Sequence, residues 1–235
     1  MLPRRFKSDS LLPALLLTMA CAFFSSCAQN AYLDTVKSLI ASSAPVDDAR
    51  LNPEYEHLRI TLSGRSAFVT LGDIDKQPDG DLTVYYGGGG LVIRLQNGRL
   101  AGVNGLLTDW HNVVMHNAPA WALAAKAGQV EWRRTRDVMP GYQYGIDERL
   151  ILTHITPPKK NPLWQAGAEG LMWFEERIAD SNASNNIGNA NNASKLPPAR
   201  YAVTIANQQT TVVYGEQCIA PDTCLTWQQW TPRKK

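Results

Sequence analysis

Short runs in which apolar and polar residues alternate constrain the fold of this 235-residue chain most strongly. Apolar residues occupy every second position in 58–62, and again in 82–86 and 91–95. Successive side chains of a strand point to opposite faces, so this period gives each strand one buried face. Ser63-Gly64 and Asn97-Gly98 lie between such runs and tolerate positive φ, which predicts tight hairpins.

Two later segments, 141–155 and 200–219, have the composition of strands and predict further strand pairs. Residues 117–127 predict one short helix, with Asn117 as its N-cap. The glycine run 87–90 lacks the Lys-Ser/Thr of a phosphate-binding loop and leads into a strand, so a hairpin tip is expected. The sequence therefore predicts a mainly β fold: an antiparallel meander sheet curled on itself, barrel-like or sandwich-like, with a few short helices.

The N-terminus has the residue order of an export signal. Arg4, Arg5 and Lys7 form a basic group, and an uncharged apolar run follows at 11–24. This run is shorter than the roughly 20 apolar residues that a membrane-spanning helix needs. Residues 1–26 are therefore expected to be a signal peptide.

The end of this signal favours lipid attachment at Cys27. The stretch 24–27, Phe-Ser-Ser-Cys, resembles the lipobox of bacterial lipoproteins, in which the cysteine thiol is acylated (palmitate) and becomes the first residue. An ordinary cleaved signal with an incidental cysteine is the alternative. Ala28 in place of Asp indicates delivery to the outer membrane, on its periplasmic face. Residues 27–50 would then form a lipidated N-terminus with a short amphipathic helix.

Two cysteines remain in the exported part, because Cys21 leaves with the signal and Cys27 takes lipid. Cys218 and Cys224 are separated by five residues that include the turn former Pro221-Asp222. An oxidising periplasm favours a disulfide between them. A metal site needs more soft ligands than this pair supplies, so the disulfide is preferred.

Composition describes an ordinary globular domain. Hydrophobic residues make up 44% and charged residues 19% of the chain, and the net charge of +2 includes the basic signal. Such a nearly neutral exported part predicts no nucleic-acid partner. We expect a single β-rich domain over 51–235, interrupted at 180–198 by a flexible loop rich in Asn and Ser.

The chain offers no recognisable catalytic pattern. His111 and His116 are five residues apart and would face different ways on a helix or a strand. Glu175 and Glu176 are adjacent, so in a strand they could not flank one glycosidic bond. No G-x-S-x-G elbow is present either. The expectation is a protein that is not an enzyme and uses no metal or cofactor.

Tryptophans and two arginines are the remaining candidates. The seven tryptophans suit stacking on sugar rings, but core packing is the preferred interpretation for each: Trp110, Trp121, Trp132, Trp164, Trp173, Trp227 and Trp230. Arg65 and Arg99 each follow a glycine where a strand leaves its turn. They are either solvated charges at a sheet edge or forks that bind a carboxylate. We expect an internal carboxylate partner, because both turns should lie at one end of the meander.

Three segments, 51–75, 91–110 and 213–230, together resemble the YjbF/GfcB family of Gram-negative lipoproteins. The matching elements are Arg59, Gly64-Arg65, Asn97-Gly98-Arg99, Gly105-Leu106, Gly215-Glu216-Gln217-Cys218 and Trp227. This family is encoded with group 4 capsule or exopolysaccharide secretion genes. The resemblance implies an all-β meander and a role in exopolysaccharide production or export, without established catalytic residues.

The function expected from these features is that of a non-enzymatic outer-membrane lipoprotein, an accessory factor in exopolysaccharide or capsule production and export. Its partners would be the membrane, through the N-terminal lipid, and polysaccharide or other secretion proteins. Two alternatives stay open: a periplasmic glycan-modifying enzyme, which should gather acids once the strands assemble, and a structural envelope lipoprotein unrelated to polysaccharide.

Overall fold

The computed structural model describes residues 51–160, 162–163, 170–179, 196–206 and 209–230. The expected signal peptide, Cys27, the helix expected within 27–50 and most of the Asn-rich segment lie outside the described residues.

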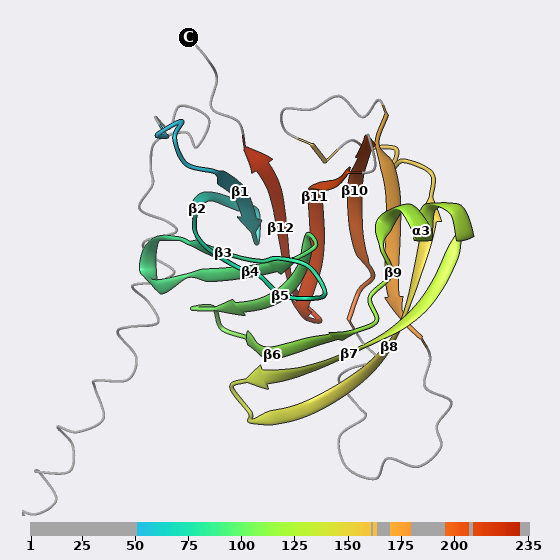
Figure 1. The fold of residues 1–235 in the computed structure, drawn as a ribbon. Coiled ribbons are helices and arrows are strands. Elements are labelled where there is room, and N and C mark those ends of the chain that lie inside the picture. The colour runs from blue at the N-terminus through green and yellow to red at the C-terminus, as the bar shows by residue number, and fades with distance from the viewer. Residues whose placement is uncertain (1–50, 161, 164–169, 180–195, 207–208, 231–235) are drawn as a thin grey trace, which may run out of the picture.

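Antiparallel strands that follow one another in sequence form one closed sheet (Figure 1). The described strands are β1 (His57–Leu62), β2 (Arg65–Asp75), β3 (Leu82–Tyr86), β4 (Val92–Gln96), β5 (Arg99–Asn104), β6 (Asp109–His116), β7 (Gln129–Met139), β8 (Gln143–Ile155), β9 (Met172–Ile178), β10 (Ala199–Ala206), β11 (Gln209–Ala220) and β12 (Thr223–Trp230). Pairing of β1 with β12 closes the ring. A 3-10 turn, η3 (Gly88–Gly90), joins β3 to β4, and a short helix, α3 (Trp121–Ala127), joins β6 to β7. The mainly β meander is confirmed, in its closed, barrel-like form.

The two predicted hairpin turns are present. Ser63 and Gly64 have φ values of 49° and 76°, and Asn97 and Gly98 have 50° and 77°. Two successive positive φ angles give the turn twist that suits a two-residue hairpin. The glycine run also forms the expected hairpin tip, between β3 and β4.

Two local predictions are wrong. Segment 141–155 contributes one long strand, β8, which pairs with β7 on one side and β9 on the other. It has no internal turn: Gly145 takes a positive φ of 61° within the strand without reversing the chain. Helix α3 begins at Trp121 with Ala120 as N-cap and no side-chain cap. Asn117 instead takes a positive φ of 54° upstream, a conformation that asparagine tolerates better than most residues.

Consecutive turns of a meander alternate between the two ends of the sheet. The α3 end carries the β2–β3, β4–β5, β6–β7 and β10–β11 connections, together with the start of β1 and the finish of β12. The disulfide end carries the β1–β2, β3–β4, β5–β6, β7–β8 and β11–β12 connections. Arg65 therefore lies at the disulfide end and Arg99 at the α3 end. The expectation that their turns share one end is wrong.

Large side chains fill the closed sheet. The core interpretation holds for the five described tryptophans that are buried: Trp110, Trp121, Trp132, Trp173 and Trp227. Trp230 is only half-buried, and Trp164 lies outside the described residues. Trp227 faces Gly215 directly across β11 and β12, and the missing Cβ of this glycine leaves room for the indole ring. The interior is thus packed around aromatic rings.

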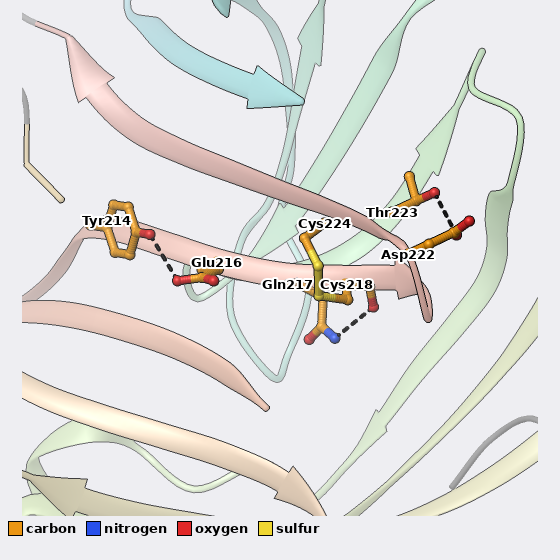
Figure 2. The surroundings of a disulfide bond; sticks show 7 residues. All are labelled: Tyr214, Glu216, Gln217, Cys218, Asp222, Thr223 and Cys224. Atoms are coloured by element: carbon orange, nitrogen blue, oxygen red, sulfur yellow. Dashed lines mark hydrogen bonds between the residues drawn. A yellow bond between two sulfur atoms is a disulfide. The ribbon is translucent and has the colours of Figure 1, made fainter. Parts of the chain in front are cut away.

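Cys218 and Cys224 are directly opposite each other in β11 and β12, and the structure joins them by a disulfide (Figure 2). Pro221 and Asp222 form the turn between the two strands. Cys218 is buried, and its carbonyl oxygen accepts a hydrogen bond of 3.0 Å from the side chain of Gln217. The bridge therefore fixes the hairpin at the disulfide end.

Candidate functional site

A group of charged side chains lies inside the sheet. Alternation along β7 turns Arg134 and Arg136 to the interior, where both are 3% exposed. Glu148 of β8 faces them: Arg134 donates two hydrogen bonds to its Oε2 and Arg136 donates two to its Oε1, at 2.6–3.1 Å. Both carboxylate oxygens are thus engaged in charge-assisted pairs.

An aromatic ring supports the same two arginines. The guanidinium carbons of Arg134 and Arg136 lie 4.8 Å and 4.2 Å from the ring centroid of Trp110, within reach of cation–π attraction. The indole Nε1 of Trp110 donates a hydrogen bond of 3.0 Å to the carbonyl oxygen of Ile219. This part of the interior is therefore satisfied by contacts within the protein.

Glu176 of β9 is a second interior carboxylate. It accepts hydrogen bonds from Trp132 Nε1 at 3.1 Å and from the Tyr201 hydroxyl at 3.5 Å. Burial raises the pKa of Glu176 despite the opposing effect of nearby arginines. Burial also acts to raise the pKa of Glu148, but Arg134 and Arg136 outweigh it and hold that pKa below its ordinary value.

Arg99 of β5 is the third interior arginine, and it is 2% exposed. Its Nη2 donates a hydrogen bond of 2.9 Å to the carbonyl oxygen of Pro119, and its guanidinium carbon lies 3.8 Å from the Trp121 ring centroid. Its Nε lies 3.9 Å from Oε2 of Glu176 and has no hydrogen-bond partner among the described residues. Burial lowers the pKa of Arg99. The carboxylate partner expected for Arg99 is therefore near, but beyond hydrogen-bonding distance.

Arg65 behaves differently. Its side chain is exposed at the start of β2, and it forms no ion pair within the described part of the chain. The expected internal carboxylate is thus missing for Arg65, because its side chain points to solvent and not to the interior of the sheet.

Arg99 also lines a pocket at the α3 end. The pocket has a volume of about 450 Å³, within the range of about 300–1,000 Å³ typical of ligand pockets. It is lined by Glu56, Leu58, Asp79, Asp81, Thr83, Tyr85, Leu95, Asn97, Gly98, Arg99, Ala118, Pro119, Ala120, Trp121, Thr210, Thr211, Val212, Trp227 and Gln229. These residues come from loops and strands that are distant in sequence and meet at this end of the sheet.

The pocket lining combines aromatic rings with hydrogen-bonding groups. Trp121 and Trp227 are buried, while Asp79 and Asn97 are exposed. The Asn97 side chain donates a hydrogen bond of 2.7 Å to the carbonyl oxygen of Asp79, which ties the β2–β3 loop to the β4–β5 turn. Trp121 Nε1 donates one of 2.9 Å to the carbonyl oxygen of Asn97, which fixes α3 over this end. Convergent polar groups in a partly apolar pocket can bind a polyhydroxylated ligand, mainly by hydrogen bonding.

The other candidate catalytic or metal-binding residues do not come together in one site. Glu175 and Glu176 point opposite ways, as expected: Arg200 donates a hydrogen bond of 3.2 Å to Glu175 outside the sheet, whereas Glu176 is inside. His111 contacts Asn104, and His116 contacts Thr135, so these histidines form no shared site. Within the described ranges, no three His, Cys, Asp or Glu side chains are grouped to hold a metal ion. The described part of the chain also contains no helix that is long and apolar enough to cross a bilayer.

Sequence reasoning did not find the interior charges. Arg134 and Arg136 are two residues apart in β7 and share the face of Trp132, which could have marked an inward polar row once the strand was assigned. Glu148 lies directly opposite Arg134 across β7 and β8. That pairing follows from strand register, which the sequence does not specify over so long a hairpin.

Comparison with known proteins gives a likeness at the level of the fold. No protein-family model and no curated protein matches the chain. Among solved structures, it is similar to the crystal structure of the hypothetical lipoprotein YmcC from Escherichia coli K12, with a TM-score of 0.52 over 86% of this chain and 97% of that one. The chain has the fold of YmcC. At 15% identity, the likeness to YmcC establishes the fold alone.

Proposed function

We propose that this protein is a non-enzymatic, lipid-anchored accessory factor in exopolysaccharide or capsule export, held at the periplasmic face of the outer membrane. The observation that carries the proposal is the fold it shares with YmcC, which is described as a lipoprotein and is matched over 97% of its length. The lipobox-like sequence ending at Cys27 and the resemblance to the YjbF/GfcB family support the same role.

In this proposal the pocket at the α3 end holds a sugar unit of the polymer. Trp121 and Trp227 form buried parts of its wall, and side chains such as Asn97 and Thr211 offer hydrogen-bonding groups for hydroxyls. The chain enters β1 at this same end, next to the pocket residue Glu56. A lipid on Cys27 would therefore connect to the domain at its pocket end, through segment 28–50.

A second candidate is a glycan-modifying enzyme, favoured by one observation. Glu56, which precedes β1, and Asp79 and Asp81, both in the β2–β3 loop, all line the pocket. Paired carboxylates are the usual machinery of glycosidic bond cleavage. Incubation of the purified protein with the secreted polymer, followed by size analysis, separates the candidates: a binding protein leaves the length distribution unchanged, and an enzyme shortens or alters the chains.

The proposed role is tested by deleting the gene and measuring polysaccharide in the medium and on the cell surface. We expect export to fall in the deletion strain and to return with the wild-type gene. Cys27→Ser should leave the protein unlipidated and soluble, and should restore export poorly, because acyl chains supply the membrane affinity. Unchanged export in the deletion strain would refute the role, and membrane recovery of an unlipidated Cys27→Ser protein would refute the anchor.

A further inference from the structure

We infer that the pocket at the α3 end is built for a sugar that carries a carboxylate, and that this carboxylate pairs with the guanidinium of Arg99. The inference rests on the proposed function, because it names the class of sugar that the pocket takes. It is carried by the charge balance of the interior, by the Nε of Arg99, which donates no hydrogen bond within the described residues, and by the place of Arg99 in the pocket wall.

The interior group contains more positive than negative charge. Three guanidinium groups, those of Arg99, Arg134 and Arg136, face two carboxylates, Glu148 and Glu176. Glu148 is engaged through both oxygens by Arg134 and Arg136. Glu176 accepts its hydrogen bonds from neutral groups and lies 3.9 Å from Arg99. Arg99 is therefore the buried cation whose ion pair, with Glu176 at 3.9 Å, includes no hydrogen bond to an anion among the described residues, and a buried charge is costly unless it is well paired.

Of these three arginines, Arg99 is the one that lines the pocket. Trp121 on one side and the carbonyl oxygen of Pro119 on another hold its guanidinium in place. A planar fork fixed in advance binds a carboxylate with little loss of side-chain freedom. Since water is largely excluded around a side chain that is 2% exposed, the attraction to an incoming anion is strengthened.

The acidic residues of the pocket define the ligand further. The acidic side chains Glu56, Asp79 and Asp81 repel a run of consecutive carboxylates but accept hydrogen bonds from hydroxyl or amino groups. The favoured ligand is thus an acidic sugar flanked by neutral or amino sugars.

The decisive experiment compares two forms of one ligand. An oligosaccharide that contains a single uronic acid, and the same oligosaccharide with its carboxyl group reduced to an alcohol, are titrated into the full-length protein in detergent by calorimetry. We expect the acidic form to bind about 10- to 100-fold more tightly, as befits a hydrogen-bonded charge pair. Equal affinity for the two forms would overturn the inference while leaving a sugar-binding role intact. Binding of neither form would count against both the inference and the pocket's part in the proposed function.

Substitutions assign the effect to Arg99. Arg99→Met removes the charge and keeps an apolar stem against Trp121, so the preference for the acidic form should vanish; Arg65→Met, at the disulfide end, should leave it unchanged. Thr210→Trp, at an exposed pocket position, should weaken the binding of both oligosaccharides equally. Thermal unfolding identifies any variant that fails to fold. If Arg99→Met fails to fold, Thr210→Trp still tests the pocket. Retained preference in a folded Arg99→Met protein would contradict the assignment.

Discussion

The guanidinium carbon of Arg99 lies 3.8 Å from the ring centroid of Trp121, so an arginine that leaves the β4–β5 turn is stacked on the first residue of α3. The same indole donates a hydrogen bond to the carbonyl oxygen of Asn97 in that turn. Trp121 also packs against Phe174 and Tyr201, with centroid separations of 5.2 Å and 5.0 Å. One helix residue therefore connects the pocket wall to the interior of the sheet.

Arg99→Lys should lower stability although the charge is kept. A lysine cannot both stack as a plane on Trp121 and donate to the carbonyl oxygen of Pro119, and a net hydrogen bond contributes about 1 kcal/mol. Arg65→Lys is the matched control, and since Arg65 is exposed it should change the unfolding free energy by less than about 0.5 kcal/mol. Urea unfolding of both variants measures the difference. Equal stability of the two would mean that the stacked arginine has no structural role.

The two interior glutamates should respond differently to loss of charge. Glu148→Gln leaves Arg134 and Arg136 buried without a carboxylate, and breaking such a buried pair costs about 3–5 kcal/mol. Glu176→Gln should cost much less, because burial already disfavours its charged form and Gln keeps an acceptor for Trp132. Chemical unfolding at neutral pH ranks the two, and a Glu176→Gln variant less stable than Glu148→Gln would contradict the arrangement of charges described above.

The pKa of Glu148 adds a pH dependence with a defined sign. Its folded-state pKa lies below the ordinary 4.5, so its stabilisation is fully present above pH 4.5 and is lost as the pH falls through the folded value. The contribution of Glu176 to stability depends on pH in the opposite direction. Because its folded-state pKa is raised, stability falls as the pH rises from 4.5 through that folded-state pKa. The gap between wild type and Glu148→Gln should therefore narrow below pH 4.5, which thermal unfolding at several pH values will show.

Gly215 makes room for an aromatic side chain, and Gly215→Ala should destabilise the sheet. Its new Cβ would overlap the indole of Trp227, which is 1% exposed and cannot move aside, so a cost of about 1–3 kcal/mol is expected. Gly72→Ala is the matched control, because its Cβ would meet only Tyr86, which is 51% exposed and free to rotate. Melting temperatures of the two variants give the comparison; an equal loss in both would argue against tight packing at Trp227.

Much of the sheet follows from the sequence because its determinants are local. The alternation of apolar and polar residues decides which face of each strand is buried. Ser63-Gly64 and Asn97-Gly98 fix two turns because these residues adopt positive φ angles. Segment 141–155 is ambiguous from sequence, because Gly145 suits either a hairpin turn or a position within one long strand. The start of helix α3 does not follow from the sequence, since it depends on Trp121 packing at one end of the sheet and not on a side-chain N-cap.

The site was less accessible to sequence reasoning, for physical reasons. Arg99 could be singled out by its place after Asn97-Gly98, but its burial against Trp121 depends on tertiary packing. The pairing of Arg134 with Glu148 depends on strand register. Arg65 was grouped with Arg99 because their local sequences are alike, and the alternation of turns between the two ends of a meander separates them.

The disulfide between Cys218 and Cys224 should form during export and stabilise the hairpin at that end (Figure 2). Closing so short a loop contributes about 2 kcal/mol in the chain-entropy description. The Cys218→Ala/Cys224→Ala double variant should unfold at lower urea by a corresponding amount. Mass spectrometry of the unreduced protein should find it two hydrogens lighter than the reduced form; free thiols in protein isolated from the periplasm would contradict the bridge.

The central claim is that the pocket at the α3 end serves polysaccharide export, and blocking it in cells tests this most directly. Thr210→Trp fills an exposed position of the pocket, and Asp222→Trp places the same side chain on an exposed turn at the disulfide end. Secreted polysaccharide is measured from strains that carry each substitution at normal protein levels. Thr210→Trp should reduce export to the level of the deletion strain, and Asp222→Trp should leave it at the wild-type level. Wild-type export from cells with folded, membrane-bound Thr210→Trp protein would contradict the claim.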